Sequence, residues 1–371
     1  MERGLSRVFM GSFAFVASFL LASFTEAAEM LPLFRATALD SGDPAPLEIE
    51  IHADFSQILG RRYGYGTDKK ARLRVPAEIR LVGDEAKRYP VVQMAEISGR
   101  GALRGNECSF PPLKIEFQGR PAAPSYFQGV DEIKVVTHCG KNVLGRSATL
   151  QEQLLKEFTV YRLHALAAAP ANFQARLAWV RYIDTSGQMD EVNEYAIFVE
   201  DISDLTKRLG AKRLFSQKDV GLKSYDPTRL TTRVDQFSAK EWVEMLMFQT
   251  MIWNYDFEVG HNLKGIVGEG GWKPVPYDFD YSELFYRRVG EIPTNTWMAF
   301  PYRCLSKAQV DEMGSFYKQA GQEMTKLIRA TKYISYESKQ IAIANIESAT
   351  KYFEQMPRPH NDEEVSPCSE R

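Results

Sequence analysis

The hydrophobic periodicity of this chain changes near residue 145, and this change is the strongest constraint on its fold. Before that point, short apolar or β-branched runs alternate with glycine, proline and charged turns, a pattern typical of strands. The strands predicted there cover residues 47–52, 73–82, 90–97, 113–117 and 132–137. After it, apolar side chains recur at helical spacing, which predicts an amphipathic helix over residues 148–168. The side chains of this stripe are Leu150, Leu154, Phe158, Tyr161 and Ala165.

The rest of the chain returns briefly to sheet and then becomes mainly helical. Further strands are predicted over 173–183, 191–199, 262–267 and 272–277, and further helices over 238–253, 307–332 and 336–355. Two capping boxes, in which a serine precedes Glu or Gln by three residues, mark helix starts at Ser238 and Ser306. This order predicts an α+β fold with two lobes and a hinge near residues 199–205.

The first 28 residues have the three parts of a cleavable signal peptide. Arg3 and Arg7 give a positive start, an apolar stretch follows over residues 8–24, and small residues allow cleavage after Ala27 or Ala28. The alternative is a membrane anchor, but the apolar stretch is slightly short and rich in Ser, Gly and Ala. The sequence therefore predicts a secreted or periplasmic protein with no transmembrane anchor after cleavage.

Four predicted regions follow from these features: a signal peptide (1–28), a β-rich N-lobe-like region (29–200), a mainly helical C-lobe-like region (201–357) and a polar tail (358–371). The hydrophobic content of 44% is enough for a real core. The formal net charge of −2, with both signs interspersed, gives no electrostatic case for nucleic acid as a partner.

The even number of cysteines suggests disulfides in an exported chain. Cys108 and Cys139 lie at the two ends of a strand-rich stretch and are the expected pair; a second pair, Cys304 with Cys368, is a weaker expectation. Closing the first loop would stabilise the chain by about 3–4 kcal/mol in the chain-entropy model. The scattered histidines and the absence of Cys-x-x-Cys spacing argue against a zinc site.

The densest polar cluster lies between residues 253 and 281. A helix delivers Asp256 into a loop, Asn262 begins a strand, and Asp278 and Asp280 follow a second strand at alternate positions, so that both are expected to point the same way. Phosphoryl transfer needs an Asp near the nucleophilic hydroxyl and an Asn plus an Asp to hold Mg²⁺, and a kinase C-lobe uses this order. Each Asp taken alone is better explained as a helix cap or a turn acid, whereas the ordered set together favours the functional interpretation.

The chain resembles the CotH-like atypical kinases, in particular their secreted bacterial relatives. The similar stretches are residues 99–101, 110–117, 133–139, 254–256, 261–262 and 275–280, of which the last, Val-Pro-Tyr-Asp-Phe-Asp, is the most specific. The resemblance implies a two-lobed protein-kinase-like fold that uses ATP with Mg²⁺ or Mn²⁺. It implies Asp256 as the catalytic base, Asn262 and Asp278 as metal ligands, and Asp280 as a supporting acid.

Other parts of a kinase site are less clear in the sequence. Gly99 and Gly101 begin only a loose substitute for a glycine-rich loop, and taken alone this stretch is better explained as a hairpin turn. Two lysines compete for the phosphate: Lys114, as the resemblance suggests, and Lys134, as general kinase topology suggests. Either could instead be a solvated edge lysine. Glu157 is the candidate helix partner of that lysine, with an exposed helix acid as the alternative.

The function predicted from these features is ATP- and metal-dependent phosphoryl transfer to a hydroxyl acceptor, which could be a protein, a glycan or a small molecule. One alternative is a kinase-fold protein without activity that binds a ligand or partner at the cell surface or in the periplasm. A weaker alternative is a metal-dependent hydrolase that uses Asp256, Asp278 and Asp280.

Overall fold

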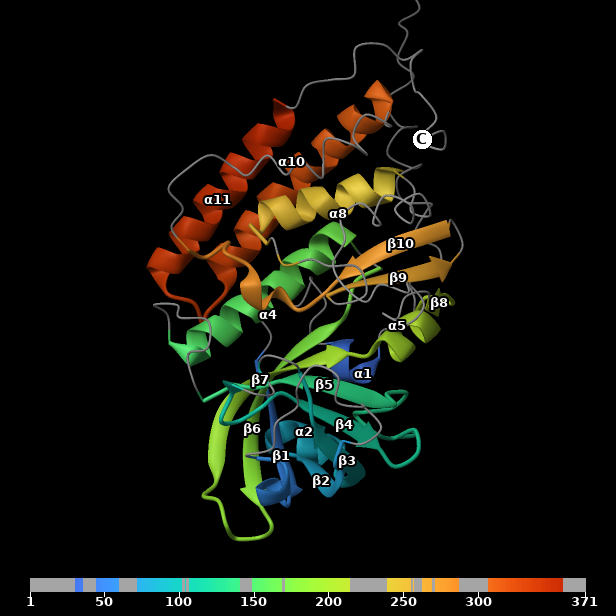
Figure 1. Ribbon diagram of the computed structural model, residues 1–371, viewed down its shortest axis with the longest axis vertical. Helices are drawn as coiled ribbons and strands as arrows, with labels where there is room; N and C mark the ends of the chain where they lie inside the picture. Colours follow the sequence, from blue (N-terminus) through green and yellow to red (C-terminus); the bar gives the residue numbers. More distant parts are fainter. Residues whose placement is uncertain are drawn as a thin grey trace, which may run out of the picture.

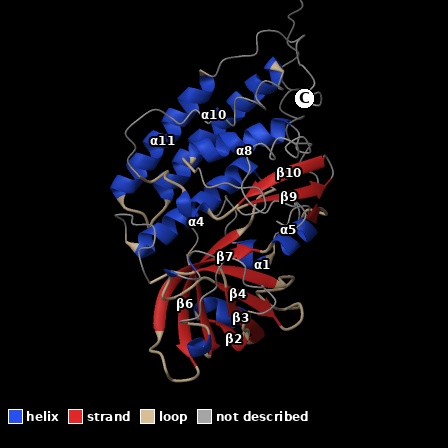
Figure 2. Ribbon diagram, viewed as in Figure 1, coloured by secondary structure: helices blue, strands red, loops and turns tan. Residues whose placement is uncertain are grey.

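The computed structural model describes residues 31–35, 45–59, 72–101, 104, 107–140, 149–168, 171–213, 239–254, 256, 262–268, 271–286 and 306–355. The predicted signal peptide, Cys304, Cys368 and the polar tail lie outside these residues. In the described part, strands gather at one end of the molecule and long helices at the other (Figure 2). The predicted α+β class is therefore confirmed.

The β-rich end is a closed barrel, in the strand order β1-β2-β3-β4-β5-β7-β6. Its strands are β1 (Leu47–Ala53), β2 (Val75–Leu81), β3 (Gln93–Gly99), β4 (Leu113–Phe117), β5 (Glu132–Val136), β6 (Ala175–Asp184) and β7 (Val192–Glu200). Neighbouring strands are antiparallel except β1 and β6, which are parallel and close the barrel with Leu47 opposite Ala178. All strands predicted before residue 200 are present, with small shifts at their ends.

Barrel closure corrects the expected N-lobe sheet. The prediction was the β-rich N-lobe of a protein-kinase-like fold, but the long β6 pairs with β7 on one side and with β1 on the other, so the strands form a closed barrel. Side chains alternate between inside and outside along the strands, so Ile49, Ile51 and Ile115 fill the barrel interior. Because β4 and β5 have neighbours on both sides, neither Lys114 nor Lys134 lies on an edge strand.

Helix α4 (Leu150–Ala168) crosses the molecule between the barrel and the helical end (Figure 1). Its residues from Leu154 to His164 are buried without interruption, so the helix is covered on every side rather than only along one apolar stripe. The amphipathic pattern identified the helix correctly but underestimated its burial, because it contacts β6 and β7 as well as α10. The polar residues between Lys156 and His164, including Glu157, therefore lie in the interior.

The helical end is built from three long helices and a small sheet. The helices are α8 (Ala239–Met251), α10 (Lys307–Ala330) and α11 (Tyr336–Glu354), and the sheet has the order β10 (Gly271–Pro276), β9 (Leu263–Gly268), β8 (Lys212–Arg213). The capping box of Ser306 with Gln309 is present at the start of α10, as predicted. Ser238, the first residue of the other predicted box, lies outside the described part. The two halves have separate hydrophobic cores, and α4 belongs to the core of the helical end.

Several short elements were not predicted. They are α1 (Pro32–Arg35), α2 (Gly83–Arg88), α5 (Ile202–Arg208) and the 3-10 turns η2 (Phe55–Gln57) and η4 (Phe279–Tyr281). Helix α5 occupies the segment expected to be a hinge, and Asp201 caps it by accepting a hydrogen bond from the Ser203 N–H. The segment between the lobes is thus ordered and partly buried.

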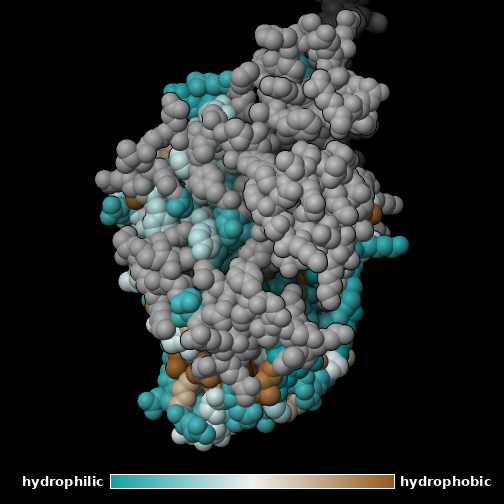
Figure 3. Space-filling view, viewed as in Figure 1, coloured by the Kyte–Doolittle hydropathy of each residue, from teal (hydrophilic) through white to brown (hydrophobic). Residues whose placement is uncertain are grey.

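Cys108 and Cys139 form a disulfide, as predicted, and it fastens the connection after β3 to the end of β5. None of the described helices combines the length and the apolar character needed to cross a membrane. In the face drawn in Figure 3, apolar residues of the described part gather over the barrel end.

Glu244 on α8 gives a prediction about the pH dependence of stability. It lines a pocket of about 140 Å³ between α4, α8 and β10. Burial, followed by the nearby Glu241, raises its pKa from 4.5 to about 7. The unfolded chain therefore loses this proton at lower pH than the folded one, so this group lowers stability as pH rises from about 4.5 to 7. Glu244→Gln should raise the melting temperature at pH 8 and leave it nearly unchanged at pH 4.5.

Thermal melts of both proteins at the two pH values test this expectation. Glu347→Gln, at an exposed position on α11, is the matched control and should change neither melt. A lower melting temperature for Glu244→Gln at pH 8 would contradict it.

Candidate functional site

The predicted acids meet where α4, the β9–β10 hairpin and η4 come together. Asn262, directly before β9, donates its side-chain N–H to the Asp256 carbonyl, and its own carbonyl accepts the Tyr277 N–H at 2.9 Å. Asp280 lies in η4 and interacts electrostatically with Asp256 and Asp278. Asp256, Asn262, Asp278 and Asp280 therefore form one group, although separate loops carry them.

Asp278 does not continue the strand as the alternating pattern suggested. Strand β10 ends at Pro276, and Asp278 takes the left-handed conformation with φ 64° and ψ 66° before η4 begins. A non-glycine residue in this conformation costs energy and is found where the surrounding structure holds it. Here the Tyr161 hydroxyl of α4 accepts the Asp278 N–H at 3.0 Å. The two acids are thus oriented by a turn and by α4 rather than by strand pleating.

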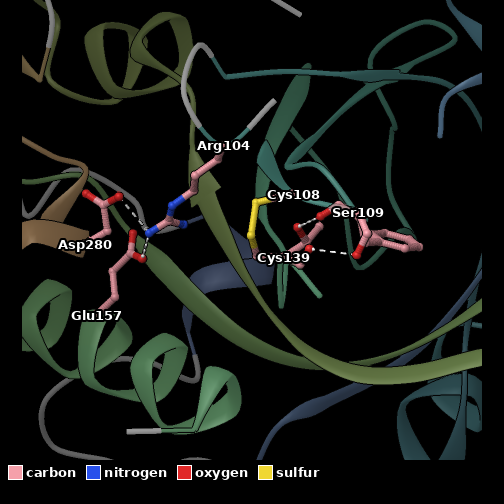
Figure 4. The surroundings of a disulfide bond; sticks show 8 residues. Arg104, Cys108, Ser109, Cys139, Glu157 and Asp280 are labelled. Carbon is pink, nitrogen blue, oxygen red and sulfur yellow. Dashed lines mark hydrogen bonds and ion pairs between the residues drawn. A yellow bond between two sulfur atoms is a disulfide. The ribbon is translucent and has the colours of Figure 1, made fainter. Parts of the chain in front are cut away.

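An arginine joins this acid group to α4 (Figure 4). Nη2 of Arg104 lies 2.9 Å from Asp280 Oδ2 and 2.9 Å from Glu157 Oε2. Glu157 is 3% exposed, so it is not the exposed helix acid considered from the sequence, and its partner here is Arg104 rather than a lysine. Burial raises the pKa of Asp280 to about 8, Arg104 opposes this, and Asp278 and Glu157 add to it.

The cationic side of the site is centred on Lys134 and the Tyr277 ring. Lys134 forms an ion pair with Asp201 at 3.0 Å, and its Nζ lies 5.4 Å from the centroid of the Tyr277 ring. Nζ of Lys264 on β9 lies 4.9 Å from the same centroid. Burial lowers the pKa of Lys134, while Asp201 opposes the effect. Two lysines therefore contact the residue that precedes Asp278.

Lys114 lies directly opposite Lys134 on the neighbouring strand but has different partners. It forms ion pairs with Glu132 at 2.6 Å and Glu116 at 3.0 Å. Burial, followed by a hydrogen bond that the protonated Glu132 donates to Asp201, raises the pKa of Glu132 to about 7. Glu132 thereby links the Lys114 pair to the Asp201–Lys134 pair, whereas the ion pairs of Lys114 among the described residues are with Glu116 and Glu132 rather than with the acid group.

The glycines lie at the end of β3 and just after it. Gly99 pairs with Leu113 of β4, and Gly101 takes φ 91°, a conformation that favours glycine. The connection to β4 runs over residues 100–112, so it is longer than a tight hairpin turn. Its Arg104 reaches the acid group, whereas no contact of either glycine with that group is recorded in the described part.

Four residues of this site were not singled out as site residues from the sequence: Arg104, Tyr161, Asp201 and Lys264. Arg104 lies within the glycine-containing stretch, but nothing in its spacing pairs it with Glu157 or Asp280. Tyr161 was assigned to the apolar stripe of α4, and helical periodicity gives no information about what its hydroxyl group contacts. For Asp201, the only signal in the sequence was its position directly after Glu200, where β7 ends. For Lys264, the only signal was its position two residues after Asn262.

The donors present fit a divalent cation that is held together with a phosphate. Mg²⁺ takes oxygen ligands and is usually bound by one or two carboxylates plus substrate phosphates and water. Asn262 and Asp278 supply an amide and a carboxylate, and Glu157 Oε1 is a buried oxygen without a hydrogen-bond partner among the described residues. No three His, Cys, Asp or Glu side chains in that part of the chain form a complete protein-only metal cage.

Comparison with known proteins gives no family assignment. No family model matches the sequence, and no curated protein matches it either. The resemblance to the CotH-like kinases therefore stays a prediction.

Several solved structures match this chain at low sequence identity and with TM-scores below 0.5. The Helicobacter pylori proinflammatory kinase CtkA has a TM-score of 0.39 at 9% identity, covering 66% of this chain and 92% of that one. The Golgi casein kinase has a TM-score of 0.35 at 9% identity, covering 86% and 75%. The HipA, HipB and operator DNA complex of Shewanella oneidensis MR-1 has a TM-score of 0.33 at 11% identity, covering 54% and 55%. At these scores, the function has to be inferred from the side chains of the site.

Proposed function

We propose that this protein is an exported kinase-like phosphotransferase, which uses ATP with Mg²⁺ or Mn²⁺ to phosphorylate a hydroxyl acceptor. The observation that carries the proposal is the placement of charge on either side of Tyr277. Lys134 and Lys264 contact its ring, and the acid group begins at the next residue, Asp278. A phosphate chain needs cations and a metal at adjacent positions, and this arrangement offers both within one short segment.

Each residue has a role in this proposal. Lys134 and Lys264 bind the phosphates, and Asn262 and Asp278 hold the metal, with Asp280 as the supporting acid. The metal would supply charge neutralisation between the phosphates. Asp256 accepts the proton of the acceptor hydroxyl as the catalytic base. The two-lobed, kinase-like division of the chain into 29–200 and 201–357 is part of the same proposal, with the site where the two regions meet.

Export is supported by the disulfide and by the character of residues 1–28. A disulfide forms and persists in oxidising compartments, which include the bacterial periplasm and the extracellular medium. The phosphate donor must then be available outside the cytoplasm. The acceptor, whether protein, glycan or small molecule, is left open by the proposal.

Nucleotide binding tests the proposal directly. ATP with Mg²⁺ or Mn²⁺ should raise the melting temperature of the mature protein, because a ligand that binds only the folded state stabilises it by about 2.7 kcal/mol at one hundred times its Kd. Asp278→Ala should remove most of this shift. Asp84→Ala, at an exposed position on α2 that pairs with Lys87, is the matched control and should keep it.

The possible results separate the candidate functions. The absence of a shift with any nucleotide and metal would reject the kinase proposal. A shift without transfer of the labelled γ-phosphate to any acceptor or to water would favour the binding protein without activity. A shift that Asp278→Ala leaves unchanged would move the nucleotide to another site.

A further inference from the structure

Arg104 and the disulfide belong to one short segment of the chain. The Cys108 N–H donates to the Arg104 carbonyl at 3.0 Å, and Cys108 is bonded to Cys139 at the end of β5. The Phe110 N–H in turn donates to the Cys139 carbonyl at 3.1 Å. Figure 4 shows the disulfide on one side of this segment and the Arg104 side chain extending from the other side towards the acids. The covalent bond therefore restrains the backbone from which Arg104 reaches the site.

The Arg104 guanidinium joins α4 to the acid loop by ion pairs, in addition to the Tyr161 hydrogen bond. One nitrogen, Nη2, contacts both Glu157 and Asp280 at 2.9 Å, and Arg104 itself is 16% exposed. The two carboxylates are buried and would repel each other if the cation between them were absent. The other carboxylate oxygen of Glu157 is buried without a hydrogen-bond partner among the described residues. The side chain is thus held towards the acid group by its contact with Arg104.

Helix α4 transmits the same restraint to Asp278. Tyr161 lies one turn after Glu157 on α4, and its hydroxyl accepts the Asp278 N–H in the left-handed conformation. If Glu157 separates from Asp280, α4 and the acid loop lose the ion-pair link between them and keep the Tyr161 hydrogen bond and the packing of Phe279 against Tyr161. We expect the orientation of Asp278 to depend in part on Arg104.

We propose that Arg104 is a positioning residue whose place is set by the Cys108–Cys139 disulfide, so that the acid group is assembled fully only in the oxidised protein. A dithiol reductant would convert the disulfide to two thiols and would itself become a cyclic disulfide, with two electrons and two protons transferred. Reduction then frees the segment that carries Arg104, and the acid loop loosens. The ligand affected rests on the proposed function, but the coupling between disulfide and acid loop does not.

Hydrogen exchange of the ligand-free protein tests this coupling, because it needs neither metal nor nucleotide. Reduction of the folded protein by a dithiol should speed exchange at least tenfold in peptides that contain residues 276–284, where the Asp278 N–H is held by Tyr161. Peptides from α10 and α11 should be unaffected and serve as the internal control. Unchanged exchange in 276–284 would overturn the inference.

A comparison of the oxidised and reduced forms, with and without the substitution Arg104→Met, separates the positioning role of Arg104 from a general effect of the disulfide on stability. In the Arg104→Met protein, exchange over 276–284 should already be fast, and reduction should add little to it. Arg104→Lys should restore part of the protection, because it keeps the cation. If reduction accelerates exchange by the same factor with and without Arg104, the disulfide acts independently of it and the inference fails. Arg181→Met, which removes the two ion pairs that this exposed arginine of β6 forms with Glu50 and Glu191, is the matched control.

Measurements of metal binding then relate the coupling between the disulfide and the acid loop to the proposed function. Mn²⁺ with ATP should bind at least tenfold more weakly to the reduced protein and to Arg104→Met than to the oxidised protein. Tighter binding by Arg104→Met would make Arg104 a competitor of the metal and would overturn its positioning role. If the oxidised protein binds no nucleotide while the exchange result holds, only the proposed function fails.

Discussion

Arg208→Ala is expected to lower the free energy of unfolding by about 3–5 kcal/mol, the largest effect that this structure predicts for a single side chain. Arg208 ends α5 and forms a two-pronged ion pair with Glu200, in which Nε and Nη2 each lie 2.9 Å from a carboxylate oxygen. Nη2 also donates to the Asn172 carbonyl at 2.8 Å. The side chains are 4% and 0% exposed, so removing the arginine leaves a buried carboxylate without its cation.

Glu200 has a limited ability to adapt to that loss. Burial already raises its pKa, and Arg208 opposes the effect, so the variant would either bury an uncompensated charge or take up a proton. Its remaining partner from the backbone is the Gln174 N–H at 3.1 Å. Unfolding in urea, monitored by circular dichroism, measures the difference.

Lys207→Ala on the same helix is the matched control for Arg208→Ala. Lys207 also forms ion pairs, with Asp131 and more distantly with Asp204 at 3.5 Å, but its own side chain is 45% exposed. An exposed pair contributes less than about 1 kcal/mol. A loss below 1 kcal/mol for Arg208→Ala, or equal losses for the two variants, would contradict the expectation that burial makes the difference.

The secondary structure followed from local patterns in the sequence. Strand β4 was predicted with the bounds it has, and α4, α10 and α11 with bounds within two residues, because alternation and helical spacing reflect neighbours only a few positions away. The barrel was not predicted, since its closure depends on parallel pairing between β1 and β6, which lie far apart in the sequence. No local pattern distinguishes a strand in a closed barrel from one in an open sheet.

Only part of the site could be predicted from the sequence, again because local patterns do not report contacts between distant segments. The polar residues after α8 and β10 stood out because acids among aromatic neighbours need partners. Which partners they have depends on contacts between distant segments, such as Arg104 with Glu157, 53 positions apart. The helical periodicity also could not predict the burial of Glu157, because α4 is covered on its polar side by elements that follow much later in the chain. The choice between Lys114 and Lys134 likewise required the register of β4 and β5.

The choice between these lysines leads to the second large expected effect. Lys134→Met should weaken ATP binding in the presence of Mg²⁺ by about 10- to 100-fold, because hydrogen bonds to a charged group contribute about 1.5–3 kcal/mol and 1.4 kcal/mol is a factor of ten. Lys134 is 15% exposed, and its Nζ lies against Tyr277, the residue before Asp278. Isothermal titration with ATP and Mg²⁺ measures the change.

Lys114→Met is the matched control, because the two lysines lie opposite each other on adjacent strands. Lys114 is neutralised by Glu116 and Glu132, so its loss should change the affinity less than threefold. Lys134→Met leaves Asp201 with its hydrogen bond to the Ser203 N–H, and an unchanged circular dichroism spectrum would show that the fold is kept. If Lys114→Met has the larger effect, the phosphate is bound by β4, as the resemblance to the CotH-like kinases implies. The charge arrangement around Tyr277 would then be structural, and the proposed position of the nucleotide would have to move towards the Glu116–Glu132 side of the barrel.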